Sequence, residues 1–256
     1  MTNSPMSDSP ASAQHTKPFI YETPNSKALH FCIRDIQSRM RLNDPYALAL
    51  EYTRTMMGFL LFKPQPRSIG MIGLGGGSLA KFCYRYLSRA RIQVAEINPR
   101  VIALREEFHI PRDDARFIVF QSDGADFVRR GPSRFDVLMV DGYDLEGLPA
   151  QLSSQSFYDD CHEALQPDGI MVVNLQHVAP DSSEHLPRIR RSFNGSVLAV
   201  DDGEDSHSIV FACKGNALET YRLGAIRRPP DLDPGAASQL LAGFALIASV
   251  LKDQRS

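Results

Sequence analysis

The stretch that decides the fold is "IGMIGLGGGSLAKFCYRYLSRARIQVAEINPRVIAL", residues Ile69 to Leu104. It opens as a short apolar run, breaks at the glycines between Gly73 and Gly77, continues with a helical pattern, and ends its second apolar run at Glu96. A strand, a glycine-rich bend, a helix and a second strand ending in an acid are typical of nucleoside-binding α/β sheets. We therefore expect a nucleoside site where these two strands end.

Apolar strand patterns alternate with helical patterns along the rest of the chain. We expect strands at 69–72, 92–96, 117–121, 137–140, 170–175, 196–200 and 209–213, the last two as an antiparallel hairpin at the sheet's edge. We expect helices at 78–87, 99–108, 125–129, 154–165 and 185–193, and a turn at 166–169. Such alternation predicts an α/β fold, a mostly parallel sheet with helices on both faces.

The segments on either side divide the chain into four expected parts. Residues 1–17 are rich in Ser, Pro and Ala and are expected to form a disordered tail, and 18–42 a small β-element. Residues 43–215 form the main domain, which starts with a helix capped by Asp44 and running through Leu61. Residues 216–256 are a linker and a C-terminal helix; its apolar run, Leu240 to Leu251, is too short to span a bilayer.

The composition excludes several classes of function. The chain has 256 residues, 43% of them hydrophobic, and a formal net charge of -2. That charge balance offers no basic surface for nucleic acid, and we expect no membrane partner. The four cysteines stand singly, without the paired spacing of a zinc site, so no metal is expected. The N-terminus lacks a signal peptide's pattern, and we expect a cytoplasmic protein.

Acidic residues follow successive expected strands, where ligands bind in sheets of this type. Gly73, Gly75 and Gly77 let the backbone turn and approach a ligand closely. A carboxylate at Glu96 can accept both hydroxyls of a ribose. Asp123 ends the third strand, where it either accepts a hydrogen bond from adenine N6 or only caps the helix that follows. The set favours an adenosyl ligand, and a dinucleotide would also fit its first two features.

The fourth strand ends in "VDGYDLEG", with Asp141 and Asp144 on either side of Tyr143. Loop acids are often only solvated, but these emerge beside the expected nucleoside. An alkylammonium group has a pKa of about 10.4, so an amine needs help to become a nucleophile at neutral pH. Paired carboxylates can hold such a cation and remove its proton.

The same motifs, in order, resemble the spermidine synthase (polyamine aminopropyltransferase) family. They are "IQSRMRLNDPYALALEYTRTMM", "IGLGGGSLAKF", "VAEINPRVIAL", "SDGADFV", "FDVLMVDGYD" and "FYDDCHEALQPDGIMVVNL". The resemblance covers about residues 19–214. It implies a small N-terminal β-domain on a seven-stranded methyltransferase-like domain, usually as a homodimer. It also implies transfer of an aminopropyl group from decarboxylated S-adenosylmethionine to an amine such as putrescine, with no permanently bound cofactor.

The resemblance also implies roles for individual residues. Asp141 would be the base that deprotonates the attacking amine, Asp144 would anchor the amine, and Tyr52 or Tyr46 would line the amine channel beside Tyr143. The expected nucleoside-binding set is Gln37, Gly73, Gly75, Gly77, Glu96, Asp123 and Gly124.

Two departures from the family's pattern leave the substrate open. Gly76 stands where the family's glycine loop usually carries an aspartate that serves the donor's amine. The family's usual D-S-S-D is "DGYD" here, and the Tyr-His pair expected on the preceding helix is absent. One alternative is therefore a methyltransferase that uses intact S-adenosylmethionine, whose carboxylate such a loop would tolerate better. The other is a non-catalytic nucleoside-binding protein of the same fold.

Overall fold

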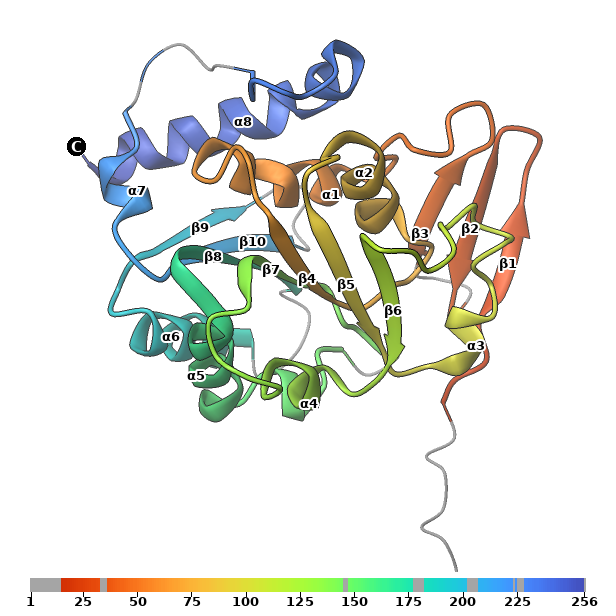
Figure 1. Cartoon of the computed structure of the whole chain (residues 1–256), viewed down its shortest axis with the longest axis horizontal. Helices are drawn as coiled ribbons and strands as arrows, with labels where there is room; N and C mark the ends of the chain where they lie inside the picture. Colours follow the sequence, from red (N-terminus) through yellow and green to blue (C-terminus); the bar gives the residue numbers. More distant parts are fainter. Residues whose placement is uncertain are drawn as a thin grey trace, which may run out of the picture.

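Two β-sheets organise the chain (Figure 1). The structure, a computed structural model, describes residues 15–32, 36–144, 147–176, 182–201, 207–222, 224 and 228–255. Most of the expected tail, residues 1–14, therefore lies outside the described part. The smaller sheet has three antiparallel strands, β1 (Phe19–Glu22), β2 (Ser26–His30) and β3 (Ile36–Arg41). It is the small N-terminal β-element expected from the sequence.

The larger sheet has seven strands in the order β6-β5-β4-β7-β8-β10-β9. Strands β4 to β8 pair in parallel, and β10 pairs antiparallel with both β8 and β9. The strand order reverses beside β4, so a crevice is expected between the carboxyl ends of β4 and β7. The strands are β4 (Ser68–Ile72), β5 (Arg91–Glu96), β6 (Phe117–Gln121), β7 (Phe135–Val140), β8 (Leu165–Gln176), β9 (Val197–Asp201) and β10 (His207–Cys213).

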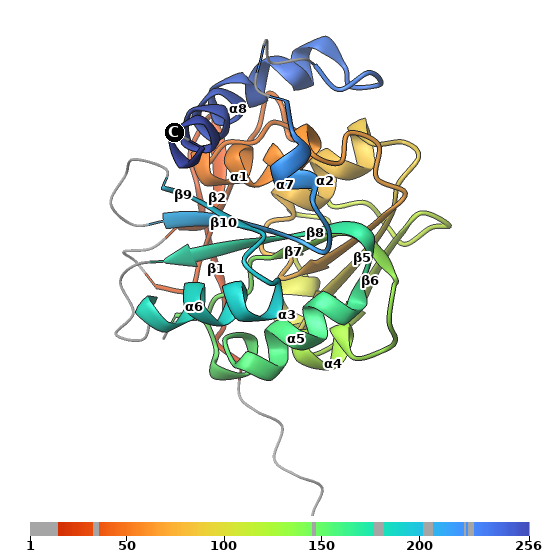
Figure 2. The same ribbon diagram turned by 90° about the vertical axis from the view of Figure 1, so that its left-hand side faces the viewer.

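Helices cover both faces of this sheet, as Figures 1 and 2 show. One face carries α1 (Glu51–Met56), with its 3-10 continuation η1 (Met57–Leu61), α2 (Ser78–Tyr86) and α8 (Pro234–Gln254). The other carries α4 (Gly124–Val128), α5 (Gln155–Ala164) and α6 (Ser182–Ser192). The short elements are α3 (Pro99–Ile102), η2 (Ala150–Leu152) and α7 (Ala217–Thr220).

Strand residues alternate between two hydrophobic cores, one under each helical layer. On β4, Met71 belongs to the core beneath α1, α2 and α8, whereas Ile72 belongs to the core beneath α4, α5 and α6. On β7, Met139 and Val140 divide in the same way. Successive side chains of a strand point to opposite faces of the sheet, so both faces are buried against apolar residues. Continuous apolar strands predict a sheet that is buried on both faces in this way. The expected doubly wound α/β fold is confirmed.

The helix expected from Pro45 begins six residues later, at Glu51. The backbone N–H of Leu48 donates to the side-chain oxygen of Gln239 on α8, at 3.0 Å, and Leu48 is fully buried. This tertiary contact holds the segment before Glu51 outside a helix. Asp44 therefore caps no α-helix; its carbonyl accepts a turn hydrogen bond from the N–H of Ala47 instead.

Two other boundaries differ from expectation by five or more residues. Helix α3 ends at Ile102 instead of extending to Phe108, because the hydrogen bonds of the next residues are those of turns. Strand β8 begins at Leu165, five residues early, and includes the expected 166–169 turn. Asp168 in that segment has a positive φ of 58°, and the pairing of β7 with β8 is irregular there. The turn residues thus form a kink inside a longer strand.

Helix α8 packs along α1 and η1. It has 21 residues and, by length and composition alone, is long and apolar enough to cross a membrane. The expectation that its apolar run is too short for this was wrong, because the helix is longer than the run from Leu240 to Leu251. Its buried face includes Leu240, Phe244 and Ile247, which join the core. A Cβ on Gly243 would lie 3.2 Å from Thr55 Cα, so the two helices approach closely at this glycine. The C-terminal helix is therefore docked on the main domain.

Candidate active site

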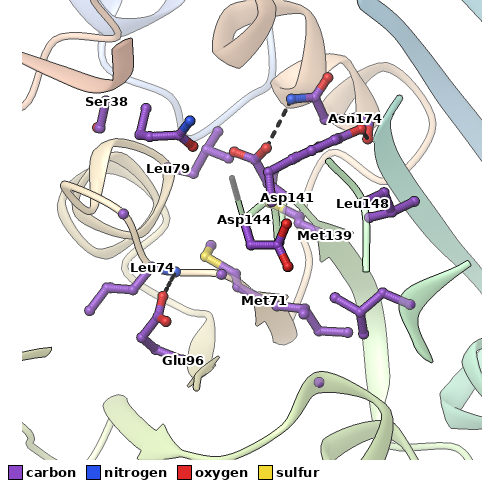
Figure 3. A pocket seen from close by; sticks show the side chains of 18 of the residues that line it. Ser38, Met71, Leu74, Leu79, Glu96, Met139, Asp141, Asp144, Leu148 and Asn174 are labelled. Atoms are coloured by element: carbon purple, nitrogen blue, oxygen red, sulfur yellow. Dashed lines mark hydrogen bonds between the residues drawn. The ribbon is translucent and has the colours of Figure 1, made fainter. Parts of the chain in front are cut away.

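A cavity of about 970 Å³ opens at the carboxyl ends of β4 to β7 (Figure 3). It brings together nearly all the site residues expected from the sequence. One side of it is lined by Gly73, Gly75, Glu96, Asp123 and Gly124, and Gln37 lines it from β3. Asp141, Tyr143, Asp144 and Tyr52 line its other side. Gly77 and Tyr46 are not among the lining residues: Gly77 packs against Ile110 before α2, and Arg85 stacks over Tyr46.

The glycine at position 73 joins the two halves of the cavity. Its φ is 93°, in a region that other residues rarely adopt, and a Cβ there would lie 2.2 Å from the carbonyl oxygen of Asp141. The N–H of Gly73 donates to the carbonyl of Ala95 on β5. The N–H of Asp141 donates to the carbonyl of Ile72 on β4. The glycine is therefore needed for contact between the loop and the end of β7.

Glu96 holds the glycine loop and remains open to the cavity. One carboxylate oxygen accepts the N–H of Leu74 at 2.9 Å, and the other accepts the N–H of Asn98 at 2.8 Å. The side chain is buried, and burial raises the pKa of this carboxyl while the backbone N–H groups oppose that rise. A carboxylate has about four acceptor sites, so two backbone bonds leave room for ribose hydroxyls.

Asp123 performs the capping role that the sequence left open. Its carboxylate accepts the N–H of Ala125 at 2.7 Å and that of Asp126 at 3.4 Å, at the start of α4. Both bonds use the same oxygen, Oδ1, and the side chain lines the cavity. Gly124, the next residue, lies against Ile72 and Leu152, where a Cβ would be 2.4 Å from the first. Capping and contact with a base are therefore compatible.

Asp141 has two hydrogen-bond donors, one for each carboxylate oxygen. Asn174 Nδ2 donates to Oδ1 at 2.9 Å, and the Tyr52 hydroxyl donates to Oδ2 at 3.2 Å. Figure 3 shows the Asp141 carboxylate turned toward Asn174. Burial raises the pKa of Asp141, while the bonds from Asn174 and Tyr52 lower it. A carboxyl with a raised pKa is a better proton acceptor than an ordinary one.

Asp144 and Tyr143 follow Asp141 in the same loop. Asp144 is exposed, and its N–H pairs with the carbonyl of Gly147 at 3.0 Å, which closes the loop. In Figure 3 its side chain lies in the open cavity below Asp141. The Tyr143 hydroxyl donates to the carbonyl of Asn174 at 2.6 Å. That bond ties the bulky ring to β8 at the edge of the cavity.

Two members of the site, Asn174 and His207, were not predicted. Asn174 is a buried polar residue in the apolar strand β8, and His207 is the first residue of β10. Asn174 Oδ1 and His207 Nδ1 are 2.9 Å apart, and the His207 ring stacks on Tyr52 with centroids 5.2 Å apart. The single amide within "IMVVNL" was the available signal for Asn174. Nothing in the sequence gives the pairing that brings His207 to it.

Comparison with known proteins decides the family. Residues 49–187 match the model of the spermine/spermidine synthase domain. The chain is also 37% identical over 215 residues to a polyamine aminopropyltransferase of Chromobacterium violaceum, which covers 84% of this chain and 82% of that protein.

The chain belongs to the spermine/spermidine synthase family.

Solved structures agree with this fold. The spermidine synthase of Thermotoga maritima has a TM-score of 0.67 at 21% identity, with 95% of this chain and 85% of that one covered. Human methyltransferase-like protein 13, solved with SAH, has a TM-score of 0.59 at 21% identity and covers 80% of this chain and 93% of that one. The fold is thus shared with methyltransferases, and the family assignment rests on the sequence matches.

Ser38 lies beside Gly76, where the sequence resemblance led us to expect an aspartate. A Cβ on Gly76 would lie 2.7 Å from Ser38 Oγ and 3.0 Å from the ring of Phe108. Ser38 comes from β3, and its hydroxyl lies 3.2 Å from that of Ser78 at the start of α2. The N-terminal sheet therefore fills the space that an aspartate at Gly76 would require.

The charges that line the cavity of this synthase are almost all negative. Among the residues that the structure describes, the lining contains no lysine and no arginine, and its other ionisable side chains are tyrosines and histidines. Its carboxyl side chains are Glu51, Glu96, Asp123, Asp141 and Asp144. Carboxylates facing a shared cavity favour cationic ligands and disfavour anionic ones.

Proposed function

We propose that this enzyme transfers the aminopropyl group of decarboxylated S-adenosylmethionine to a diamine such as putrescine and releases methylthioadenosine. The observation that supports the proposal most is the carboxylate-lined cavity of a spermine/spermidine synthase family member, with no lysine or arginine in its described lining. The donor carries a sulfonium and an ammonium group, and the acceptor carries ammonium groups. Both substrates are cations, and they match that charge.

The nucleoside half of the donor fits the side of the cavity nearest β4 to β6. Glu96, at the end of β5, would accept the ribose hydroxyls. Asp123 and Gly124 would contact the adenine, and Gln37 would lie beside the nucleoside from β3. The sulfonium would then lie near the glycine loop and Asp141, which meet at Gly73.

Asp141 would act as the base. It accepts a proton from the ammonium of the acceptor, whose nitrogen lone pair then attacks the aminopropyl carbon bonded to sulfur. The new C–N bond forms as the C–S bond breaks, and that electron pair stays on sulfur as the neutral thioether of methylthioadenosine. The proton on Asp141 is later released to solvent. Because the leaving group is neutral, alignment and exclusion of water are the main tasks that remain.

The lining also bears on the choice between the two forms of the donor. Intact S-adenosylmethionine carries a carboxylate at the end that the decarboxylated donor lacks. No described side chain in the lining supplies a positive charge from lysine or arginine to pair with it. Acids in the cavity would repel that carboxylate and attract the bare ammonium. The methyltransferase alternative therefore has less support than aminopropyl transfer.

Calorimetric titration tests this function. We expect decarboxylated S-adenosylmethionine and methylthioadenosine to bind more tightly than intact S-adenosylmethionine, and Glu96→Ala to abolish binding. Glu106→Ala removes an exposed carboxylate outside the cavity and serves as the matched control. Turnover of putrescine should then yield methylthioadenosine. Preference for the intact donor would indicate a methyltransferase, and failure of all three ligands to bind would leave a non-catalytic role.

A further inference from the structure

His207 contacts both hydrogen-bond donors of Asp141. Its Nδ1 lies 2.9 Å from Asn174 Oδ1, and its ring stacks on Tyr52 at 5.2 Å with 9° between the planes. Asn174 and Tyr52 in turn each donate to one oxygen of Asp141. The contact depends on the fold, because the antiparallel register of β8 and β10 pairs His207 with Gln176, close to Asn174.

We propose that His207 is a positioning residue, which holds the Asn174 amide and the Tyr52 ring so that both donate to Asp141. The inference rests on the proposed function for the role of Asp141 as the base. It adds that His207, on β10, keeps both hydrogen-bond donors of Asp141 in place.

The donor and acceptor chemistry of an amide supports this assignment. An ionised carboxylate only accepts hydrogen bonds, so Asn174 must present its NH₂ group to Asp141. Its oxygen then faces His207 and requires a donor. His207 therefore carries a proton on Nδ1, and this proton locks the amide in one orientation. Without it, the amide can rotate and present its oxygen to the carboxylate, where two acceptors repel each other.

The contact with Tyr52 acts on the other oxygen of Asp141. Two parallel rings at this separation are in van der Waals contact, so His207 restricts the rotation of the Tyr52 ring. The Tyr52 hydroxyl is thereby kept within 3.2 Å of Asp141 Oδ2. Burial and the negative charge of Asp141 both raise the pKa of Tyr52, so this hydroxyl remains protonated and able to donate.

Other ionisable groups line the same cavity and affect the pH dependence. Tyr143 and Asp144 share the loop of Asp141, and His185 reaches the cavity from α6. Loss of a positive charge on His207 would itself raise the pKa of Asp141, apart from any effect on the amide. A variant that lacks the charge but retains an N–H donor separates these two effects.

Two substitutions of His207 isolate its hydrogen bond. His207→Phe keeps a ring against Tyr52 but has no donor for Asn174. His207→Asn has no titrating charge, but its amide nitrogen can take the place of Nδ1. Neither substitution touches the nucleoside side, so methylthioadenosine should bind each variant as tightly as wild type. That binding, together with a thermal melt, shows that each variant is folded.

The deciding measurement is an NMR titration of ¹³C-labelled aspartate carboxyl groups in the full chain, with the Asp141 signal identified by its loss in Asp141→Asn. We expect the Asp141 titration midpoint to move toward higher pH in both variants, because both lose the charge of His207. The midpoint of His207→Phe should lie higher than that of His207→Asn by at least a threefold difference in proton concentration. The acidic limb of the kcat/KM profile should move in parallel. An unmoved midpoint in His207→Phe, or equal shifts in both variants, would overturn the positioning role.

The outcome is separable from that of the proposed function. Absence of putrescine turnover by the wild-type enzyme would refute the proposed reaction, whereas the NMR midpoint of Asp141 would still confirm or reject the action of His207 on that carboxyl. Conversely, normal turnover with an unmoved midpoint would retain the reaction and reject the positioning role.

Discussion

The hydroxyl of Ser38 lies where a side chain on Gly76 would begin, 2.7 Å from the position of its Cβ. The two residues belong to different parts of the fold. Ser38 lies on β3 of the N-terminal sheet, and Gly76 lies in the loop that follows β4 of the larger sheet. The aspartate that the sequence resemblance implies for this loop is therefore not merely missing. Its space is used to pack the N-terminal sheet against α2.

Restoring that acid should fail in the wild-type background. Gly76 is not among the positive-φ residues, so the cost of Gly76→Asp is steric, and overpacking of this kind costs about 1–3 kcal/mol. We expect Gly76→Asp to unfold at a lower denaturant concentration and Ser38→Gly to recover part of the loss. Urea melts of the two single variants and the double variant measure this coupling. Equal stability of Gly76→Asp and wild type would contradict the packing argument.

Replacing Asp141, the proposed base, should reduce activity and increase stability. Asp141→Asn keeps the shape of the side chain, and we expect the rate to fall about 10²- to 10⁴-fold, the contribution of a general base. Burial raises the folded-state pKa of Asp141, so the folded state loses stability as pH rises through the window between the unfolded and folded values. This loss occurs in wild type and is absent in the variant.

Thermal melts across pH check the second part of this prediction. We expect Asp141→Asn to melt above wild type at pH 7, and the difference to shrink below pH about 4, where the unfolded carboxyl also binds its proton. A variant that turns over putrescine at the wild-type rate would exclude Asp141 as the base.

Asp144 should determine how tightly the amine binds. A hydrogen bond to a charged group contributes about 1.5–3 kcal/mol, which corresponds to roughly a 10- to 100-fold change in binding. We expect Asp144→Asn to raise the KM for putrescine by that factor while kcat changes less, because the side chain holds the cation without taking its proton. Steady-state kinetics at saturating donor measure both values. A fall in kcat at unchanged KM would assign the residue a different role.

The buried Lys81 gives the fold a pH dependence at the alkaline end. Its Nζ donates to the carbonyl of Phe108 at 2.7 Å, and burial lowers its pKa to about 8. Between pH 8 and the unfolded-state value of 10.5, the unfolded chain binds the extra proton, so wild type gains stability as pH rises. In Lys81→Met this rise should be absent. Urea melts at pH 7, 8.5 and 9.5 test it, and parallel curves for the two proteins would refute it.

The contact between α8 and α1 should be sensitive to size at one position. A Cβ on Gly243 would lie 3.2 Å from Thr55 Cα, so Gly243→Val overpacks the helix pair at a cost of about 1–3 kcal/mol. The exposed Ala245 on the same helix supplies the control. We expect a lower melting temperature for Gly243→Val and only a small change for Ala245→Val. Similar effects of the two would argue against close packing at Gly243.

The sequence sufficed for the parts of the fold that local pattern determines. The glycine bend and the apolar strands predicted the sheet, and the acids at Glu96, Asp123, Asp141 and Asp144 predicted its cavity, because parallel strands bring their carboxyl ends together. The start of α1 could not be predicted in this way. It depends on a hydrogen bond from Leu48 to Gln239, 191 residues away in the sequence.

The inner part of the site depends on strand register, which residue types do not specify. His207 reaches Asn174 because β10 runs antiparallel to β8 with Ile209 opposite Asn174. A shift of one residue would turn the side chains of β10 to the opposite face. Ser38 and Gly76 meet for a similar reason, across two separate sheets. Motifs therefore located the residues that are expected to contact substrate, and only the structure showed those that support them.

Helix α8 gives the end of the chain an influence on the amine side of the cavity. Gln239 holds Leu48, and Gly243 abuts Thr55, so α8 braces the helix that carries Tyr52 to Asp141. A truncated variant that lacks α8 would retain every residue predicted to contact substrate. It would lose the packing that supports the helix of Tyr52. A shortened variant should therefore retain α8.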